Sequence, residues 1–501
     1  MASNRTRWVL SAIAGAILPL AFAPFEQFWI APLSYAVLFY AWRDATPGKA
    51  FWIGWLYGAA SFGAGTYWTY IAIHDFGEAP IALAAAISST LVLTLAIFVG
   101  AVGWTAARWF KTSGAAAWLG TLPALWVLSE WLRSWVLSGF GWLAAGYSQT
   151  DSWLMAYAPL VGIHGMSWVV LLSAGALITL WLGTRIGRGV AAAALLAVWG
   201  IGLAAANHHW TEPKDRLLAV ALVQGAIQQD LKWRPEQLPG TLALYSELTQ
   251  QSAGSALIIW PEAAIPELYE RVTGYVKSLQ EWSERNGSVV MLGILRRNTE
   301  GDTDTFQNIL IALTDPMQIY VKRHLVPFGE YFPVPDFIRS WMRLMSLPYT
   351  DAVPGDDDQA PFDLLGERIA LTICYEDVFG AEQLHYFPQA TLLVNVSNDA
   401  WFGDSIAPHQ HLQIARVRAA ETGRYLLRST NTGISAFIDP LGSVVATAPQ
   451  FEPAILEHSV RGYTGSTPYV RVGNYPVIVA ASIVLLLQLL PITKLTIRPR
   501  T

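Results

Sequence analysis

Eight segments of the chain are apolar and long enough to span, or nearly span, a lipid bilayer as helices. They comprise residues 8–22, 29–42, 51–73, 81–107, 115–137, 159–183, 190–206 and 475–492. The composition agrees with them, since 53% of the 501 residues are hydrophobic and only 14% are charged. Because a soluble protein of this length is less apolar, we predict an integral membrane protein.

Lysines and arginines occur between alternate pairs of these segments. They are Arg5, Arg7, Arg43, Lys49, Arg108, Lys111, Arg185, Arg188, Lys494, Arg498 and Arg500. The short loops in between contain neither residue type. Because cytoplasmic loops carry the excess of basic residues, both termini are predicted to lie in the cytoplasm. Residues 1–207 would then form seven transmembrane helices, and residues 475–492 the eighth.

The first segment could also be a cleavable signal peptide, because a basic start precedes its apolar run. Bulky residues and prolines follow where small residues would precede a cleavage site, namely Pro19, Phe22, Pro24 and Phe25. Removing the segment would also leave the charge alternation one crossing short. We therefore interpret it as a membrane helix.

Residues 217–460 have the pattern of a soluble α/β domain. Stretches with helical spacing, at residues 241–252 and 274–286, separate some of its strand-like runs. The short apolar runs between turn signals cover residues 218–223, 256–259, 288–295, 308–313, 369–373, 392–397, 434–438 and 444–448. Runs without strict alternation suit strands that are buried on both faces or packed between layers. This domain is expected on the outer side of the membrane.

Cys374 is the only cysteine of the chain and follows the apolar run 369–373. A single unpaired cysteine is more often a small buried hydrophobe than a nucleophile. Two other residues favour a nucleophilic role for Cys374. Glu262 can act as a base, and Lys322 can supply positive charge beside an oxyanion. Taken singly, Glu262 could be a surface turn residue and Lys322 a solvated cation, but together the three residues suit thioester chemistry.

Several motifs occur in the order and spacing of a known family. They are WPEAAIP at 260–266, KRHLVPFGEYFP at 322–333, ICYED at 373–377, VSNDAWFGDS at 396–405, PALWVLSEWLRSW at 123–135, GFGWLAAGYSQ at 139–149 and LLRSTNTGISA at 426–436. They resemble the nitrilase superfamily and, more narrowly, the bacterial apolipoprotein N-acyltransferases. The resemblance implies a polytopic α-helical membrane protein with an inserted α/β nitrilase-like αββα sandwich domain. It also implies the bacterial inner membrane, with the sandwich in the periplasm.

The resemblance further implies a two-step acyl transfer. Glu262 would be the base, Cys374 the nucleophile, and Lys322 with the backbone N–H of Tyr375 the oxyanion donors. The acyl donor would be a membrane phospholipid, typically phosphatidylethanolamine, and the acceptor a diacylglyceryl apolipoprotein. No cofactor and no metal would be needed, and we expect a monomer.

Four further residues, one of them outside these motifs, receive roles from the resemblance. Glu330 would orient or assist Lys322, while Trp233 and the pair Tyr375 and Glu376 would shape the substrate entrance. Trp233 could instead be a core residue, and Glu376 a surface acid. The apolar stretch 326–355 is interpreted as a membrane-facing lid, with a packed hairpin arm as the alternative.

Glu130 and Arg133 are ionisable residues inside an apolar segment, where charge is costly. They could contact a lipid headgroup or the soluble domain, or form a structural ion pair. His409 and His411 lack a neighbouring ligand set, so we do not interpret them as a metal site.

Two rival functions remain open on the sequence. A membrane-tethered amidase would use the same three residues on a small amide, but would need neither an apolar lid nor seven preceding spans. A transporter would need ionisable residues along several spans, and few are present. With a net charge of −5 and no basic cluster, nucleic-acid binding is not expected.

Overall fold

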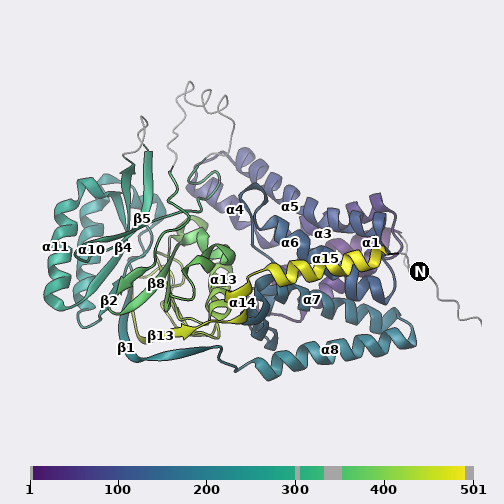
Figure 1. Cartoon of the computed structure of the whole chain (residues 1–501). Coiled ribbons are helices and arrows are strands. Elements are labelled where there is room, and N and C mark those ends of the chain that lie inside the picture. Colours follow the sequence, from purple (N-terminus) through teal and green to yellow (C-terminus); the bar gives the residue numbers. More distant parts are fainter. Residues whose placement is uncertain (1–3, 299–304, 332–351, 491–501) are drawn as a thin grey trace, which may run out of the picture.

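The computed structural model describes residues 4–298, 305–331 and 352–490. Its helices form a bundle on one side, and an α/β sandwich lies on the other, as Figure 1 shows. The chain enters the sandwich after the seventh long helix and returns to the bundle through the last one. The sandwich is therefore an insertion near the carboxyl end of a helical protein.

Each apolar segment predicted from the sequence coincides with helix in the bundle. The principal elements are α1 (Asn4–Ile17), α2 (Ile30–Trp42), α3 (Pro47–Gly65), α4 (Trp68–Ile71), α5 (Ile81–Trp109), α6 (Leu122–Arg133), α7 (Ala158–Leu182), α8 (Arg185–Ala205) and α15 (Tyr475–Leu489). Within the described residues, three helical stretches are long and apolar enough to cross a membrane: Ile81–Trp109, Trp153–Leu182 and Arg185–Ala205. The helices Ile30–Trp42 and Tyr475–Leu489 are apolar but shorter. The eight crossings remain a prediction.

Glycines allow α3 and α5 to approach closely. A Cβ atom at Gly54 would lie 2.7 Å from the Val99 carbonyl oxygen, and one at Gly58 would lie 2.9 Å from Ala96 Cα. Both distances are too short for a side chain, so these glycines are packing contacts, as their spacing predicts. At Gly63 the nearest atom would be 3.8 Å away, an ordinary contact.

Two β-sheets form the centre of the sandwich. The first has the order β13 (Ala454–Gly465), β1 (Thr211–Gln224), β2 (Leu257–Ile259), β4 (Val289–Asn298), β5 (Thr305–Ala312) and β6 (Gln318–Val321), with β3 (Ile265–Leu268) also paired to β4. The second has the order β12 (Val444–Thr447), β11 (Ala436–Ile438), β10 (Leu426–Thr430), β9 (Leu392–Ser397), β8 (Glu367–Ile373) and β7 (Phe362–Leu364). Parallel pairing of β1, β2 and β4 in one sheet, and of β8, β9 and β10 in the other, aligns their carboxyl ends.

Apolar side chains from both sheets meet in one core, which includes Leu222, Ile259, Leu371 and Val394. The outer face of the first sheet packs on α10 (Leu238–Gln251) and α11 (Thr273–Asn286). The outer face of the second sheet packs on α13 (Ala407–Thr422). This layer order confirms the predicted αββα sandwich. Its sheets begin at Thr211 and end at Gly465, slightly outside the predicted bounds 217–460.

Helix α13 joins the sandwich to the bundle. Its Gln410 side chain donates to the Gly65 carbonyl and accepts from the Trp68 indole, at 3.0 and 3.1 Å. Farther along the helix, Glu421 accepts the Ile163 N–H at 2.7 Å. These bonds connect both ends of α13 to the helical bundle, so the two parts form one structure around it (Figure 1).

The close approach of α3 and α5 predicts a stability difference between two matched variants. Gly54→Ala places a methyl group against a backbone oxygen, whereas Gly63→Ala does not. Both gain the same helix propensity, so their difference isolates the clash, which should cost about 1–3 kcal/mol. The thermal midpoint of the detergent-solubilised protein should be lower for Gly54→Ala. Equal midpoints would contradict this packing.

Candidate active site

Lys322 lies between two carboxylates. Its ammonium is 3.1 Å from Glu262 Oε1 and 2.8 Å from Glu330 Oε1, and its side chain is only 1% exposed. The Asn308 amide donates to the same two oxygens, at 2.8 and 3.3 Å. Burial alone would lower the pKa of Lys322, but the two carboxylates raise it well above its usual value. The lysine is therefore a fixed positive charge.

Glu262 follows the end of β2 and is buried. Its second oxygen, Oε2, accepts the backbone N–H of Asn398 at 2.8 Å. With Oε1 bound to Lys322 and Asn308, the carboxylate is held from both sheets. A carboxylate fixed in this way can accept a proton without rearranging.

Cys374 directly follows β8 and has a φ angle of 53°, in the left-handed region. This conformation costs a non-glycine residue roughly 1–3 kcal/mol and is often found at functional sites. The side chain is partly buried and lies at the edge of the core between the sheets. Burial and the nearby Glu262 raise the pKa of the thiol, although Lys322 opposes them. The resting sulfur is therefore a thiol, and it needs a base at the moment it reacts.

The structure thus brings Glu262, Lys322, Glu330 and Cys374 into one site. Each of Glu262, Lys322 and Cys374 comes from a position just beyond a strand end, where α/β folds place their sites. Asn308 and Asn398 belong to the same network, although neither was predicted as a site residue; Asn398 lies in the motif at 396–405, and Asn308 lies in none of the motifs.

Glu376 is almost fully buried and accepts four hydrogen bonds. The donors are the Ile373 N–H at 2.6 Å, the Tyr320 hydroxyl at 2.9 Å, and the N–H groups of Arg323 and His324 at 2.6 and 3.2 Å. The carboxylate therefore ties the turn after Cys374 to the segment after Lys322. This geometry favours a bracing role over the predicted contact with substrate.

Tyr375 contacts a loop of the helical bundle. Its hydroxyl donates to the Gly139 carbonyl at 2.6 Å, and its ring stacks on Trp142 with the centroids 5.6 Å apart. Trp142 was not predicted as a site residue, because nothing local indicates that the loop after α6 reaches Cys374. One wall of the site is therefore built by the bundle.

Arg133 and Glu130 hold this loop in place. Arg133 donates to the carbonyl groups of Phe140 and Trp142, both at 2.7 Å, and Glu130 accepts the N–H of Ala145 at 2.9 Å. The structure places no direct ion pair between the two side chains, both of which it describes. The sequence left open a headgroup contact, a contact with the soluble domain or an ion pair, and the observed role is to anchor the loop.

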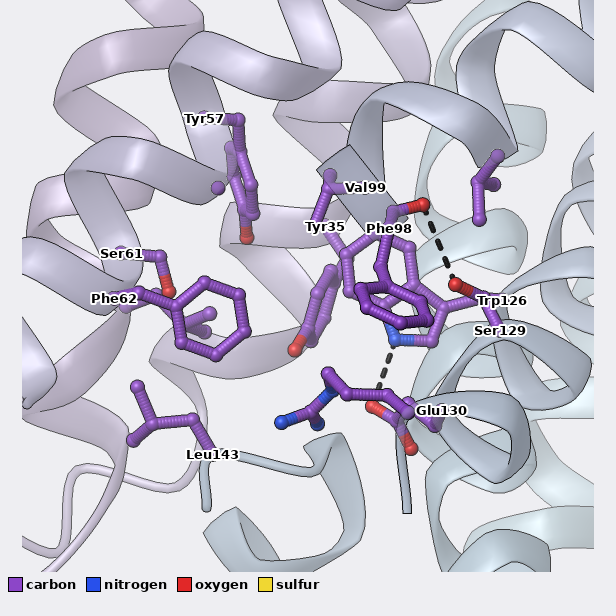
Figure 2. A pocket seen from close by; sticks show the side chains of 14 residues that line it. Tyr35, Tyr57, Ser61, Phe62, Phe98, Val99, Trp126, Ser129, Glu130 and Leu143 are labelled. Carbon is purple, nitrogen blue, oxygen red and sulfur yellow. Dashed lines mark hydrogen bonds between the residues drawn. The ribbon is translucent and has the colours of Figure 1, made fainter. Parts of the chain in front are cut away.

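A pocket borders this anchor, and its cavity volume is about 20 Å³. Figure 2 shows the side chains that line it, with the bond from Trp126 to Glu130 at 2.7 Å drawn as a dashed line. The other Glu130 oxygen and the Tyr35 hydroxyl are buried without a hydrogen-bond partner among the described residues. The anchor therefore borders a mainly apolar pocket that contains a few polar groups.

Trp233 is 45% exposed and follows the short helix α9 (Gln229–Lys232). The preceding Lys232 is buried, with its ammonium 3.3 Å from the Glu262 carbonyl oxygen. Burial lowers the pKa of Lys232 to about 8, although Glu262 opposes this shift. Trp233 thus projects from the turn that supports Glu262, and its predicted substrate contact remains a prediction.

His411 and Asp399 lie next to the nucleophile and were not predicted as members of the site. His411 Nδ1 is 3.0 Å from Asp399 Oδ1, and Nε2 is 3.3 Å from the Cys374 carbonyl oxygen. No group of three potential metal ligands occurs in the described ranges. The predicted apolar lid falls mostly on residues 332–351, which lie outside the described residues.

Comparison with known proteins agrees with the fold of the sandwich. The family model for carbon-nitrogen hydrolases matches residues 219–469, so the sandwich belongs to that class. A second family model, the apolipoprotein N-acyltransferase N-terminal domain, matches residues 14–176 in the bundle. A CN-hydrolase superfamily protein from Xanthomonas campestris aligns with 53% of this chain and 97% of its own, at 20% identity and a TM-score of 0.36.

Full-length relatives narrow the class. An apolipoprotein N-acyltransferase from Methylococcus capsulatus is 40% identical over 94% of this chain and 93% of its own. That of Nitrosomonas europaea is 42% identical over 96% of each chain. The chain belongs to the apolipoprotein N-acyltransferase family, and it is an acyltransferase.

The raised pKa of Cys374 predicts the pH dependence of its alkylation. Iodoacetamide reacts with the thiolate, so the rate should rise about tenfold per pH unit through about pH 9.5, without levelling near the ordinary cysteine pKa of roughly 8.5. The single cysteine makes the labelling specific. The denatured chain, as a control, should level off near the ordinary value. A plateau below about pH 8 in the native protein would mean that the thiol is ionised at rest.

The loop anchor predicts a loss of stability in Arg133→Met. This change leaves two buried carbonyl groups without their donor and leaves Glu130 without a compensating charge, which should cost about 3–5 kcal/mol. Arg133→Lys keeps the charge and should lose less. Thermal midpoints in detergent would test this order, and an unchanged midpoint for Arg133→Met would contradict the anchor.

Proposed function

We propose that this enzyme transfers a fatty acyl chain from a membrane phospholipid to the amino-terminal amine of a diacylglyceryl apolipoprotein. The acyl chain is carried as a thioester on Cys374. The observation that carries the proposal is the Cys374 thiol beside a buried Glu262 and Lys322, in a site walled by the membrane bundle through Trp142 and Tyr375. The names of the full-length relatives support the lipoprotein acceptor.

In the first half-reaction, Glu262 takes the Cys374 proton as sulfur attacks the ester carbonyl. Because the thiol is protonated at rest, proton removal and bond formation occur together. Lys322 and the N–H of Tyr375 stabilise the oxyanion. The ester C–O bond then breaks, Glu262 returns the proton to the leaving oxygen, and lysophospholipid departs from the acyl thioester.

In the second half-reaction, the free amine of the apolipoprotein attacks the thioester carbonyl. Glu262 takes a proton from the attacking nitrogen, and the same donors stabilise the second oxyanion. The C–S bond breaks and the sulfur regains its proton from Glu262. The products are an amide and the original thiol, so the two half-reactions form a closed cycle with no cofactor.

Glu330 assists by holding Lys322, since its carboxylate is 2.8 Å from the ammonium. It also accepts the Val326 N–H at 2.8 Å, which connects the lysine to the start of the predicted lid. We propose that Trp233 lines the route of substrate entry and that Glu376 supports the site from behind. Phosphatidylethanolamine is the proposed donor.

We place the enzyme in the bacterial inner membrane, with both termini cytoplasmic. Residues 1–207 supply seven transmembrane helices, residues 217–460 the periplasmic catalytic domain, and residues 475–492 the eighth helix. The three long apolar helices and the alternation of basic residues support this arrangement. The proposed working unit is a monomer.

The test is mass spectrometry of the purified protein after incubation with phosphatidylethanolamine. A fatty-acyl adduct should appear on Cys374, be released by hydroxylamine, and be absent in Cys374→Ala. Glu262→Gln removes the base while keeping the shape, and its rate of adduct formation should fall about 100-fold or more. Adding a diacylglyceryl peptide should discharge the adduct. No adduct with any phospholipid, together with ammonia release from small amides, would support an amidase instead.

A further inference from the structure

His411 contacts the nucleophile from the side of the bundle. It lies on α13, is 2% exposed, and its ring is 5.9 Å from that of Trp142. Its Nε2 is 3.3 Å from the Cys374 carbonyl oxygen, and its Nδ1 is 3.0 Å from Asp399 Oδ1. Neither contact has a place in the acyl-transfer steps described above.

Both partners of the His411 ring are hydrogen-bond acceptors. A carbonyl oxygen can only accept, and so can an ionised carboxylate. Asp399 is ionised because Arg428 and Ser397 also donate to it, at 3.0 and 2.8 Å. Burial would raise the pKa of Asp399, but the charges of His411 and Arg428 lower it far below its usual value. To make both bonds, the His411 ring must carry a proton on each nitrogen, as an imidazolium.

Other charged groups lie near the ring. Asp377 is buried on the same side of the site, and Arg428 lies 3.6 Å from Asp377 and 3.0 Å from Asp399. Burial raises the pKa of Asp377, although His411, Arg428 and Arg418 oppose this shift. The protons on His411 therefore follow from the two acceptors that its ring contacts.

The bond to Cys374 orients a peptide plane that the reaction uses. The Cys374–Tyr375 peptide bond is trans, so its C=O and N–H point in opposite directions. Holding the carbonyl oxygen toward His411 therefore directs the Tyr375 N–H to the other side. Because Cys374 has an unfavourable φ of 53°, the plane needs such an outside contact to stay in place.

We propose that His411, held as an imidazolium by Asp399, is a positioning residue that fixes the Cys374–Tyr375 peptide so that the Tyr375 N–H points at the oxyanion. The inference rests on the proposed function in one respect, since it takes the Tyr375 N–H as an oxyanion donor. It predicts a defect in steps that pass through an oxyanion and no defect in other reactions of the thiol.

The experiment compares two reactions of Cys374 in His411→Phe and His411→Gln. Acylation by p-nitrophenyl butyrate passes through a tetrahedral oxyanion, whereas alkylation by iodoacetamide is a direct displacement at carbon and does not. In His411→Phe, the rate constant for acylation should fall about 100-fold to 1,000-fold, the loss expected for one oxyanion donor. Alkylation should stay within about threefold.

Two further variants sharpen the comparison. The amide of His411→Gln can still donate to the Cys374 carbonyl. The acylation rate constant of this variant should therefore be about tenfold higher than that of His411→Phe. Asp399→Asn removes the carboxylate that holds the ring charged, and it should reproduce the selective loss. His409→Phe, two residues away on the same helix, is the matched control and should leave both rates unchanged.

Three outcomes would overturn the inference. Acylation could be unchanged in His411→Phe, or both reactions could fall together, which would mean a packing or thiol-activating role. If His411→Phe does not fold, equal acylation in Asp399→Asn and the parent enzyme would have the same meaning. The nitrophenyl ester keeps this test separate from the lipid chemistry. If the parent enzyme is acylated by this ester but by no phospholipid, the proposed acyl donor is refuted. The effect of the His411 variants on acylation can still be measured in that case.

Discussion

The site depends on the pairing of the buried Lys322 ammonium with two carboxylates. A single cation of this kind could not remain charged inside the sandwich without compensation. Glu262 and Glu330 supply that compensation at 3.1 and 2.8 Å, and each carboxylate is held by further backbone N–H groups. The cluster therefore has one carboxylate in excess over its cation. That excess is what allows Glu262 to accept a proton while Lys322 keeps its charge for the oxyanion.

The bundle contributes one wall of the candidate site. Its loop after α6 reaches Tyr375 through Trp142 and the Gly139 carbonyl, and Arg133 fixes the loop from inside the bundle. A sandwich separated from the helices would lose this wall. The same dependence explains why α13 carries so many buried polar residues, since they bond to helices on one side and to the site on the other.

Local patterns in the sequence predicted the apolar strands and the residues at their ends. Every strand-like run, from 218–223 to 444–448, corresponds to an observed strand or to part of one. Four of the described strands were missed. The strands β3 and β7 are only four and three residues long, buried Arg428 interrupts the apolar pattern of β10, and β13 is an edge strand with a mostly polar, partly exposed face. Helix α13 was missed because six of its thirteen buried residues are polar. His411, Asn308 and Trp142 depend on contacts between distant segments, and no local pattern predicts such contacts.

In the proposed mechanism, a thiol that is protonated at rest suits a lipid donor and a bulky acceptor. A preformed thiolate would react with other electrophiles while the site waits for either substrate. Under this proposal, the raised pKa of Cys374 keeps the sulfur unreactive until Glu262 removes its proton during attack. Rate must then come from stabilising the oxyanion, which depends on the rigid placement of Lys322 and the Tyr375 N–H. The two carboxylates on Lys322 and the contact of His411 with the Cys374 carbonyl serve this one requirement from opposite sides of the nucleophile.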